Sequence, residues 1–278
     1  MLRCGFACYI RVLGLTMIPD GGALAMALRR LGYKPYTLRD SFKHGHATRH
    51  PAEWVAALHE GKAVDFNKML VDYDAVVGPP AVLLYEEILR GCPDYTKVIL
   101  VSETDKQQWA NDYQRYVVPL LKDARPSSRN RVAKALHAMI SEMILKPIPD
   151  EPGRAASGGD CQRDVVSRQA GALELFEAEV QLKVPPNRLL VHCHKDGWGP
   201  ICKFLGKEVP CESYPPLDNG MHVIRNLVER IERTEKLTLL LVLGALCGAV
   251  YLSYPLLASV DGSVRKLYRD YQTAYGSS

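Results

Sequence analysis

Short apolar runs alternate with longer stretches of helical periodicity over most of the chain. The apolar runs have the length and aliphatic character of buried strands, and they lie within residues 9–15 and at 74–77, 97–101 and 188–192. Helical spacing of apolar residues is found at 51–60, 81–89, 106–121, 132–145, 165–184 and 197–205. This order predicts an α/β fold with a doubly wound, mostly parallel sheet, in which the polar residues 34–52 form a loop.

The first of these units, residues 9–33, has the form of a phosphate-binding strand, loop and helix. Its loop holds Pro19, Asp20, Gly21, Gly22 and Ala23 at the start of the expected helix, where backbone N–H groups can bind a phosphate. The loop lacks the Gly-x-x-x-x-Gly-Lys-[Ser/Thr] pattern. Asp20 is also expected to place a negative charge where a phosphate would sit. We therefore expect a nucleotide-type fold with a damaged phosphate site.

A second apolar feature, near the C-terminus, has the length of a membrane-spanning helix. Residues 237–260 are 24 consecutive uncharged residues, mostly Leu, Val, Ala and Gly, and a transmembrane helix needs about 20. The alternative is a core helix, but core helices are usually shorter and amphipathic. Tyr251 and Tyr254 lie toward one end, as interfacial aromatic residues do, and Pro255 is expected to kink or end the helix.

These patterns divide the chain into four predicted parts. They are an α/β domain over 1–220, a charged linker helix over 221–236, a transmembrane helix over 237–260 and a short tail over 261–278. The arrangement predicts a single C-terminal anchor in a lipid bilayer. Basic residues flank the apolar run on both sides, so the positive-inside rule does not orient it.

The first residues continue into the first strand, which favours a strand over a signal peptide. We therefore place the α/β domain on the cytosolic side of the membrane. Gly244 and Gly248 form a small-xxx-small pair, which favours a homodimer through the membrane helix.

Composition disfavours several other kinds of protein. The net charge is only +4, and basic residues are interspersed with acidic ones, so nucleic acid is not an expected partner. The eight cysteines form no CxxC pair and give no disulfide framework, which indicates reduced thiols. Residues 147–159 are rich in Pro, Gly and Ser and are predicted to be mobile.

One group of histidines has the spacing of a metal site. His44, His46 and His50 could hold a metal, but no Cys or carboxylate pattern accompanies them. A solvated loop is therefore the preferred interpretation, and no metal is predicted. Trp54 and Trp198 are expected to serve packing rather than recognition.

A second group of residues follows the predicted strand 188–192. His192 and His194 lie at its carboxyl end, where ligands of α/β proteins bind, and alternation places both on one face. They could act as a base or a metal pair, or they could simply pack at the strand end. Lys195 is the nearest basic residue for an anion. His194 and Lys195 are the candidate catalytic residues.

Four segments carry a family resemblance. They are Ala27–Tyr33, Trp54–Val77, Pro93–Leu100 and Arg188–Gly206. The last is the most specific, because it combines Lys-Asp-Gly-Trp at a helix start with Cys-x-Phe-Leu-Gly at the helix end. Over about residues 10–220 the chain resembles the P-loop sulfotransferase-like family, in the branch often labelled as NAD-dependent epimerases. The resemblance implies a P-loop NTPase-type fold and sulfuryl transfer from 3′-phosphoadenosine-5′-phosphosulfate (PAPS) to a hydroxyl or amine.

The chain departs from this family where the resemblance implies that PAPS is bound. The family's loop carries an Arg and two Thr residues, which the shorter loop at Pro19–Ala23 lacks. An Arg that would hold the 3′-phosphate is replaced by Glu103, and a Ser that would assist it falls near Asn111. Two further family positions, usually Asp and His, are Gly78 and a residue near Leu38. Each departure removes a donor or adds an acid at a position that should meet sulfate or phosphate.

Together these patterns favour a membrane-anchored protein of this family in which PAPS-dependent transfer is lost or weakened. Such a protein would act as a binding or scaffold module. The alternative is a divergent active sulfotransferase that uses PAPS, with Lys195 or His194 in place of the missing groups. A dinucleotide oxidoreductase is disfavoured, because the loop has no Gly-x-Gly-x-x-Gly pattern.

Overall fold

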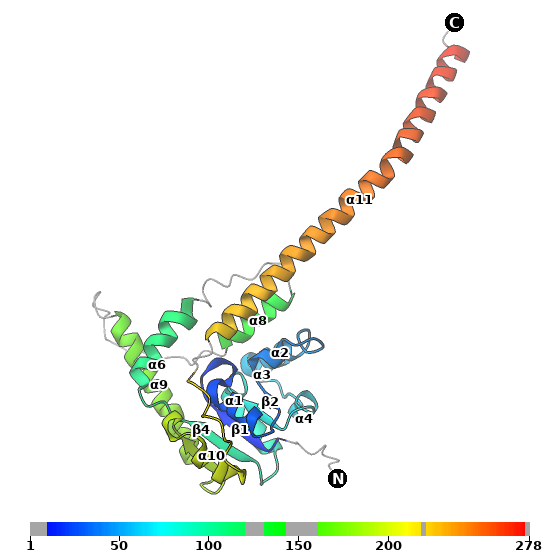
Figure 1. The fold of residues 1–278 in the computed structure, drawn as a ribbon. Coiled ribbons are helices and arrows are strands. Elements are labelled where there is room, and N and C mark those ends of the chain that lie inside the picture. Colours follow the sequence, from blue (N-terminus) through cyan, green and yellow to red (C-terminus); the bar gives the residue numbers. More distant parts are fainter. Residues whose placement is uncertain (1–9, 120–130, 143–160, 218–220, 276–278) are drawn as a thin grey trace. The chain divides into compact units, whose positions relative to one another are not determined.

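A computed structural model describes residues 10–119, 131–142, 161–217 and 221–275. Five strands form one sheet in the order β2-β3-β1-β4-β5 (Figure 1), and the neighbouring strands pair in parallel. The strands are β1 (Val12–Leu15), β2 (Pro35–Tyr36), β3 (Ala75–Val77), β4 (Lys97–Val101) and β5 (Leu189–His192). This confirms the predicted α/β class and the parallel sheet. The segment 147–159, predicted to be mobile, lies outside the described residues.

Helices follow the strands much as the apolar periodicity predicts. They are α1 (Gly22–Arg30), α2 (Leu38–Ser41), α3 (His50–Glu60), α4 (Phe66–Met69), α5 (Tyr85–Gly91), α6 (Lys106–Asp112), α8 (Arg131–Glu142), α9 (Cys161–Lys183), α10 (Trp198–Leu205) and α11 (Met221–Tyr275). Short 3-10 turns at Pro19–Gly21, Ala81–Leu84 and His194–Asp196 precede α1, α5 and α10, and a π-helical turn, Tyr113–Val117, follows α6.

The segment 34–52 differs from its prediction as a loop. It contains β2, which pairs with β3, and the short helix α2. Tyr36 in β2 is 1% exposed, and its hydroxyl accepts a hydrogen bond from Trp54 Nε1 at 3.0 Å. A strand of two residues leaves no apolar run to recognise, and its stability comes from this tertiary burial rather than from local propensity.

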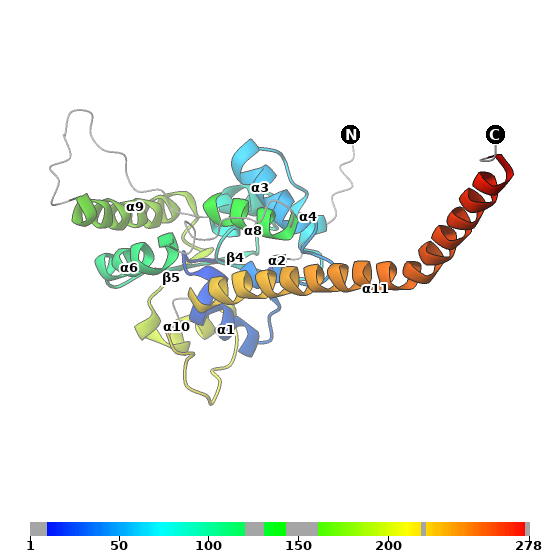
Figure 2. The same ribbon diagram turned by 90° about the horizontal axis from the view of Figure 1, so that it is seen from above.

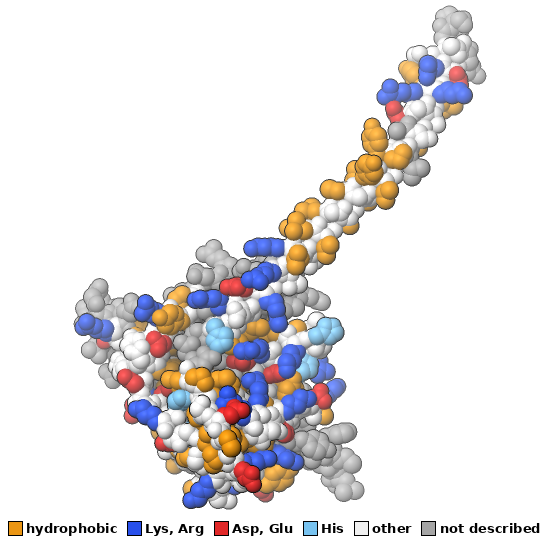
Figure 3. All heavy atoms as spheres, viewed as in Figure 1, with side chains coloured by type: hydrophobic (Ala, Val, Ile, Leu, Met, Phe, Trp, Pro, Cys, Tyr) orange, Lys and Arg blue, Asp and Glu red, His pale blue; other side chains and the backbone are white. Residues whose placement is uncertain are grey.

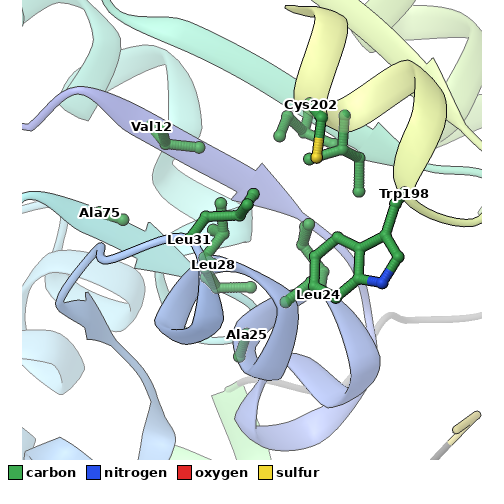
Figure 4. Packing of buried hydrophobic residues seen from close by; sticks show 12 residues of the cluster. Val12, Leu24, Ala25, Leu28, Leu31, Ala75, Trp198 and Cys202 are labelled. Atoms are coloured by element: carbon green, nitrogen blue, oxygen red, sulfur yellow. The ribbon is translucent and has the colours of Figure 1, made fainter. Parts of the chain in front are cut away.

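One face of the sheet packs against α1 and α10. Val12, Ala75 and Ile99 from three neighbouring strands meet Leu28 of α1 and Trp198 of α10 in one buried cluster (Figure 4). Gly14 allows this close approach, because a Cβ there would lie 2.8 Å from Leu24 Cδ2. Trp54 and Trp198 are both buried, as expected for packing residues.

The opposite face of the sheet is buried as well. Leu13, Val76 and Val98 are aligned with one another across β1, β3 and β4 and are 0% exposed. Figure 2 shows α3, α8 and α9 on this side of the sheet, with α1 and α10 on the other. Helices on both faces are the doubly wound arrangement. The strand ends that carry the candidate residues are therefore held by a core packed on both sides.

Helix α11 begins in the α/β unit and continues into a second unit. The compact units are residues 1–228 and 229–278, and Val223 and Leu227 are buried within the first. Residues Lys236–Thr273 form one helical segment that is long and apolar enough to cross a membrane; its most apolar 18-residue window has a mean hydropathy of 2.0, and none of that window is buried. Hydrophobic side chains cover this stretch between two zones of charged residues (Figure 3). The helix continues through Pro255 rather than ending there.

Candidate functional site

A cleft of about 1200 Å³ opens at the carboxyl ends of β1, β4 and β5. Its walls are the first loop (residues 16–23), the segment 101–109 at the end of β4, the α9 residues Ser167–Glu174, and the turn after β5. Helices α6 and α9 lie side by side along one wall (Figures 1 and 2). Ligands of parallel α/β sheets bind at this edge, so the cleft is the candidate site.

The structure brings most of the predicted site residues to this cleft. Pro19, Gly21, Ala23 and Glu103 line it, together with His194 and Lys195. Asp20, Gly22 and Asn111 are absent from its lining within the described part of the chain. Six of the residues named from the sequence therefore line one cleft, and the other three lie outside its lining.

The first loop forms a closed turn rather than an open anion-binding loop. Its residues 19–21 form a 3-10 turn, in which the Gly21 N–H donates to the carbonyl of Ile18 at 3.0 Å. The end of β3 presses on this turn, because a Cβ on Gly78 would lie 3.0 Å from both Gly21 N and Ile18 O. An anion nest needs successive N–H groups that point at the ligand. Here the Gly21 N–H is already used inside the loop.

Asp20 corrects one expectation, since its carboxylate does not occupy the phosphate position. The side chain is 6% exposed and accepts hydrogen bonds from the Thr37 hydroxyl and from the Arg39 N–H. Arg39 Nε also lies 3.0 Å from Oδ2. Asp20 adopts a φ of 63° to make these contacts. Its charge is thus neutralised beneath the loop, where it ties the loop to β2 and α2.

A buried polar network continues from this anchor. Thr37 donates its backbone N–H and its hydroxyl to Asp40, which also pairs with Lys43. Tyr36 shares its hydroxyl with His50 Nδ1 at 3.0 Å. His50 is 0% exposed, and burial lowers its pKa to about 4, so it is neutral at physiological pH. This network stabilises β2 and α2, which hold the first loop in place, and its residues do not line the cleft.

Two of the three histidines at 44–50, His46 and His50, make structural contacts, whereas His44 is exposed. His46 Nδ1 contacts the Asp40 carbonyl at 2.9 Å, and its ring stacks on His50 at 4.1 Å between centroids. Within the described ranges, no group of three His, Cys, Asp or Glu side chains is placed to hold a metal ion. The metal interpretation of this spacing is not supported by the geometry.

Glu103 lines the cleft beside a second, buried carboxylate. Glu177 of α9 is 5% exposed and accepts hydrogen bonds from the Ser102 hydroxyl and the Glu103 N–H. Lys106 Nζ lies 3.2 Å from the same carboxylate. Burial and the charge of Glu177 raise the pKa of Glu103. In the described part of the chain the Glu103 carboxylate itself has no hydrogen-bond or ion-pair partner.

The turn after β5 forms the opposite wall. His192 is 1% exposed, and its Nε2 lies 3.2 Å from the Tyr214 hydroxyl. Its Nδ1 is buried and has no hydrogen-bond partner among the described residues. Burial lowers the pKa of His192, which favours the neutral ring. Tyr214 packs edge-on against His192, His194 and Trp198, so it closes an aromatic corner of the cleft.

Several lining residues were missed from the sequence. Trp109 and Tyr113 stack at 4.9 Å between ring centroids on the α6 side, and Tyr214 comes from the Pro-rich segment after α10. Glu177, which supports Glu103 without lining the cleft itself, is 74 residues away in the sequence and lies inside a long charged helix. The spacing of Trp109 and Tyr113 by four residues was the one local signal, since such residues share a helix face.

The charge of the lining is negative overall. Four carboxylates, Glu103, Asp105, Asp112 and Glu174, face two lysines, Lys106 and Lys195. Lys106 is already paired with the buried Glu177. Lys195 is therefore the lining lysine without a carboxylate partner among the described residues. An anion with several charges would meet repulsion here that one exposed ammonium group does not offset.

The α/β part of the chain matches a known family of proteins. The family model described as a sulfotransferase domain matches residues 11–223. "Ava biosynthesis cluster protein M" from Aspergillus versicolor is 30% identical to this chain over 221 residues, which cover 74% of the chain and 80% of that protein. The family match spans the first loop, the end of β4 and the turn after β5.

Proposed function

The chain belongs to the sulfotransferase domain family, and from this premise we propose that it has lost or weakened PAPS-dependent transfer and acts as a binding module. Sulfotransferases usually take the sulfuryl group from PAPS, whose phosphates and sulfate carry several negative charges. A site for PAPS needs cationic groups and free N–H donors directed at those charges. The proposal concerns whether this cleft still offers them.

The observation that carries the proposal is the pairing of Glu103 with Glu177. Glu103 stands where the family resemblance implies an Arg, and the neighbouring Lys106 is held by Glu177 at 3.2 Å. The closed turn of the first loop removes the Gly21 N–H as a donor as well. Both changes weaken anion binding by separate physical routes, since one adds repulsion and the other removes a hydrogen bond.

Isothermal titration calorimetry tests the proposal directly. The full chain in a neutral detergent is titrated with PAPS and with its desulfated product, 3′-phosphoadenosine-5′-phosphate (PAP). We expect no binding tighter than about 100 μM, which corresponds to about −5.5 kcal/mol. Micromolar binding of PAPS together with sulfuryl transfer to added alcohols or amines would contradict the proposal.

A divergent active enzyme is the second candidate, because His194 and Lys195 both line the cleft. In that case Lys195 would contact the phosphosulfate and His194 would take the proton from the acceptor. The acceptor oxygen or nitrogen would bond to sulfur while PAP leaves with the electrons of the broken S–O bond. If a transferase activity is measured, Lys195→Ala and His194→Ala should each reduce it. Unchanged rates in both variants would exclude this route.

We also propose that α11 anchors the protein in a membrane with the α/β domain in the cytosol. The apolar residues 237–260 are largely exposed on the helix, and charged residues precede and follow them. Exposing such a surface to water is unfavourable by about 25 cal/mol per Å², whereas a bilayer matches it. The helix is therefore better suited to lipid than to solvent.

Within the membrane we propose a homodimer through Gly244 and Gly248. Apart from the helix's own backbone and the adjoining residues, no heavy atom of the described residues lies within 4 Å of the position that a Cβ would take on either glycine, so another helix could approach closely at this face. Crosslinking in membranes should trap a dimer that Gly244→Leu reduces. An unchanged dimer yield in that variant would place any contact elsewhere on the helix.

A further inference from the structure

We propose that the cleft binds an organic cation, an amine-bearing molecule with an aromatic or other flat apolar body, with Glu103 as the residue that receives the ammonium group. This inference rests on the proposed function, because it names the ligand class of a cleft that no longer suits PAPS. It is carried by a carboxylate without a hydrogen bond or ion pair, a buried ring nitrogen without a hydrogen bond, and aromatic side chains, all of which belong to residues that line one cleft.

The first step concerns the charges around Glu103. Its buried neighbour Glu177 is satisfied by Ser102, by the Glu103 N–H and by Lys106. Glu103 is partly buried, and although the charge of Lys106 acts on it, its carboxylate has no hydrogen bond or ion pair within the described residues. A carboxylate that is removed from water without a partner is unfavourable. A bound ammonium group would supply the missing charge and up to three hydrogen-bond donors.

The second step concerns His192, which is independent of the acidic residues. It lines the cleft, is 1% exposed, and has a buried Nδ1 without a hydrogen-bond partner in the described part of the chain. Buried polar atoms are nearly always paired in native proteins, and this nitrogen is closed to solvent, so a donor on a ligand reaches it only when the ring or its cover moves. When Nε2 carries the proton and donates to Tyr214, Nδ1 is an acceptor for an N–H group.

The third step concerns the remaining walls. Trp109 and Tyr113 stack on the α6 side, and Tyr214 closes the β5 side. Aromatic faces attract cations and also bury flat apolar groups. The volume of about 1200 Å³ accommodates a small organic molecule. A simple metal cation would leave these aromatic surfaces without a partner.

Three probes with the same indole ring separate charge from apolar binding. Tryptamine is a cation, tryptophol is neutral and indole-3-acetate is an anion at pH 7. Each is titrated into the full chain in neutral detergent, and binding is followed by calorimetry. We expect affinity to fall in the order tryptamine, tryptophol, indole-3-acetate, with about tenfold or more between the first and the last.

Matched variants locate the effect in the cleft. Glu103→Gln keeps the size of the side chain and removes its charge, and it should weaken tryptamine about three- to tenfold while leaving tryptophol within about twofold. Glu208→Gln, an exposed residue outside the cleft lining, should change neither. This control also corrects for partition of the probes into the micelles, since that partition is the same for both variants.

The outcomes separate this inference from the proposed function. If none of the probes binds at millimolar concentration, if the order is reversed, or if Glu103→Gln behaves like Glu208→Gln, the inference is wrong. The proposed function then still stands, provided that PAP does not bind in the same sample. If PAPS binds at micromolar concentration and is turned over, the proposed function fails whatever the order of the amines.

Discussion

Arg39 forms a salt bridge to Asp20, with its Nε 3.0 Å from Asp20 Oδ2 and its backbone N–H 3.1 Å from Oδ1. This contact explains how an acidic residue is accommodated in the first loop. The buried carboxylate holds the loop to Arg39 and does not place a charge in the cleft lining. It also fixes Asp20 at a φ of 63°, where only a strong local contact offsets the strain of a non-glycine residue.

The first prediction therefore concerns stability. Asp20→Ala leaves the Arg39 N–H and guanidinium without their acceptor, while the Thr37 hydroxyl keeps Asp40 as an acceptor. The variant should lower the free energy of unfolding by about 1–2 kcal/mol. Asp20→Asn keeps an acceptor and tolerates the positive φ, so it should cost less. Urea unfolding followed by tryptophan fluorescence measures both. Asp94→Ala, whose side chain is fully exposed, is the control and should stay within about 0.5 kcal/mol.

The second prediction concerns the packing of the loop on Gly78. A Cβ there would lie 3.0 Å from two backbone atoms of the turn, and φ is +75°. Gly32 has a similar φ of +86°, but nothing lies within 4 Å of its Cβ position. Gly32→Ala should thus cost about 1–2 kcal/mol from the backbone alone, and Gly78→Ala at least about 2 kcal/mol more. Equal losses in the two variants would show that the loop does not press on β3.

The third prediction concerns pH and the buried His50. Its pKa is lowered to about 4 by burial, below the ordinary value of 6.5. The unfolded chain therefore takes up a proton at this residue between pH 6.5 and pH 4, whereas the folded chain does not. Stability should fall by about 2–3 kcal/mol as the pH falls through this window. Urea midpoints measured from pH 7 to pH 4 follow this loss.

His50→Gln provides the comparison for that pH series. This variant loses the contact with Tyr36 and should be less stable at pH 7, but its stability should change less between pH 6.5 and pH 4. Carboxylates also titrate in this range, so the decisive quantity is the difference between the pH dependence of stability of the variant and that of the unmodified chain. Parallel pH curves would mean that His50 is not held neutral in the folded state.

The parts of this fold that the sequence predicts are those specified by local patterns. The strand, glycine turn and helix of residues 9–33 are visible as an apolar run and a change of periodicity, and the motif at Arg188–Gly206 supports the family that the comparisons confirm. β2 was missed because Pro35 and Tyr36 form no run. Its place in the sheet follows from the burial of Tyr36 against Trp54, which lies 18 residues away.

In the candidate site too, the sequence identifies individual residues but not the distant residues that contact them. Glu103 was recognised as a charge reversal, and the structure adds that Glu177, 74 residues further on, lies beside it. The expectation for Asp20 was wrong because its partners Thr37 and Arg39 lie 17 and 19 residues away. A sequence pattern shows which residue occupies a position in the loop. It does not show whether a distant segment binds that residue's side chain and keeps it out of the cleft.

The fourth prediction reverses the charge at Glu103. Glu103→Arg should increase the affinity for PAP about tenfold or more, because a charge-assisted contact to phosphate replaces a repulsion. Combining it with Glu177→Gln removes the carboxylate that would compete for the new guanidinium, so the double variant should bind PAP most tightly. Calorimetry at fixed ionic strength measures the gain. Glu208→Arg adds the same charge change outside the cleft, and an equal gain there would indicate non-specific attraction.

The fifth prediction concerns the C-terminal helix. In cells that produce the full chain, carbonate should leave the protein in the membrane pellet, whereas a chain that ends at Lys236 should be released. Leu246→Arg places a charge near the middle of the apolar run, which costs about 2.5–3.5 kcal/mol of insertion energy, and it should shift part of the protein to the supernatant. Leu182→Arg, at an α9 residue that is 86% exposed, should not. Release of the unmodified chain by carbonate would refute the anchor and leave the exposed apolar surface of α11 to be covered by protein instead.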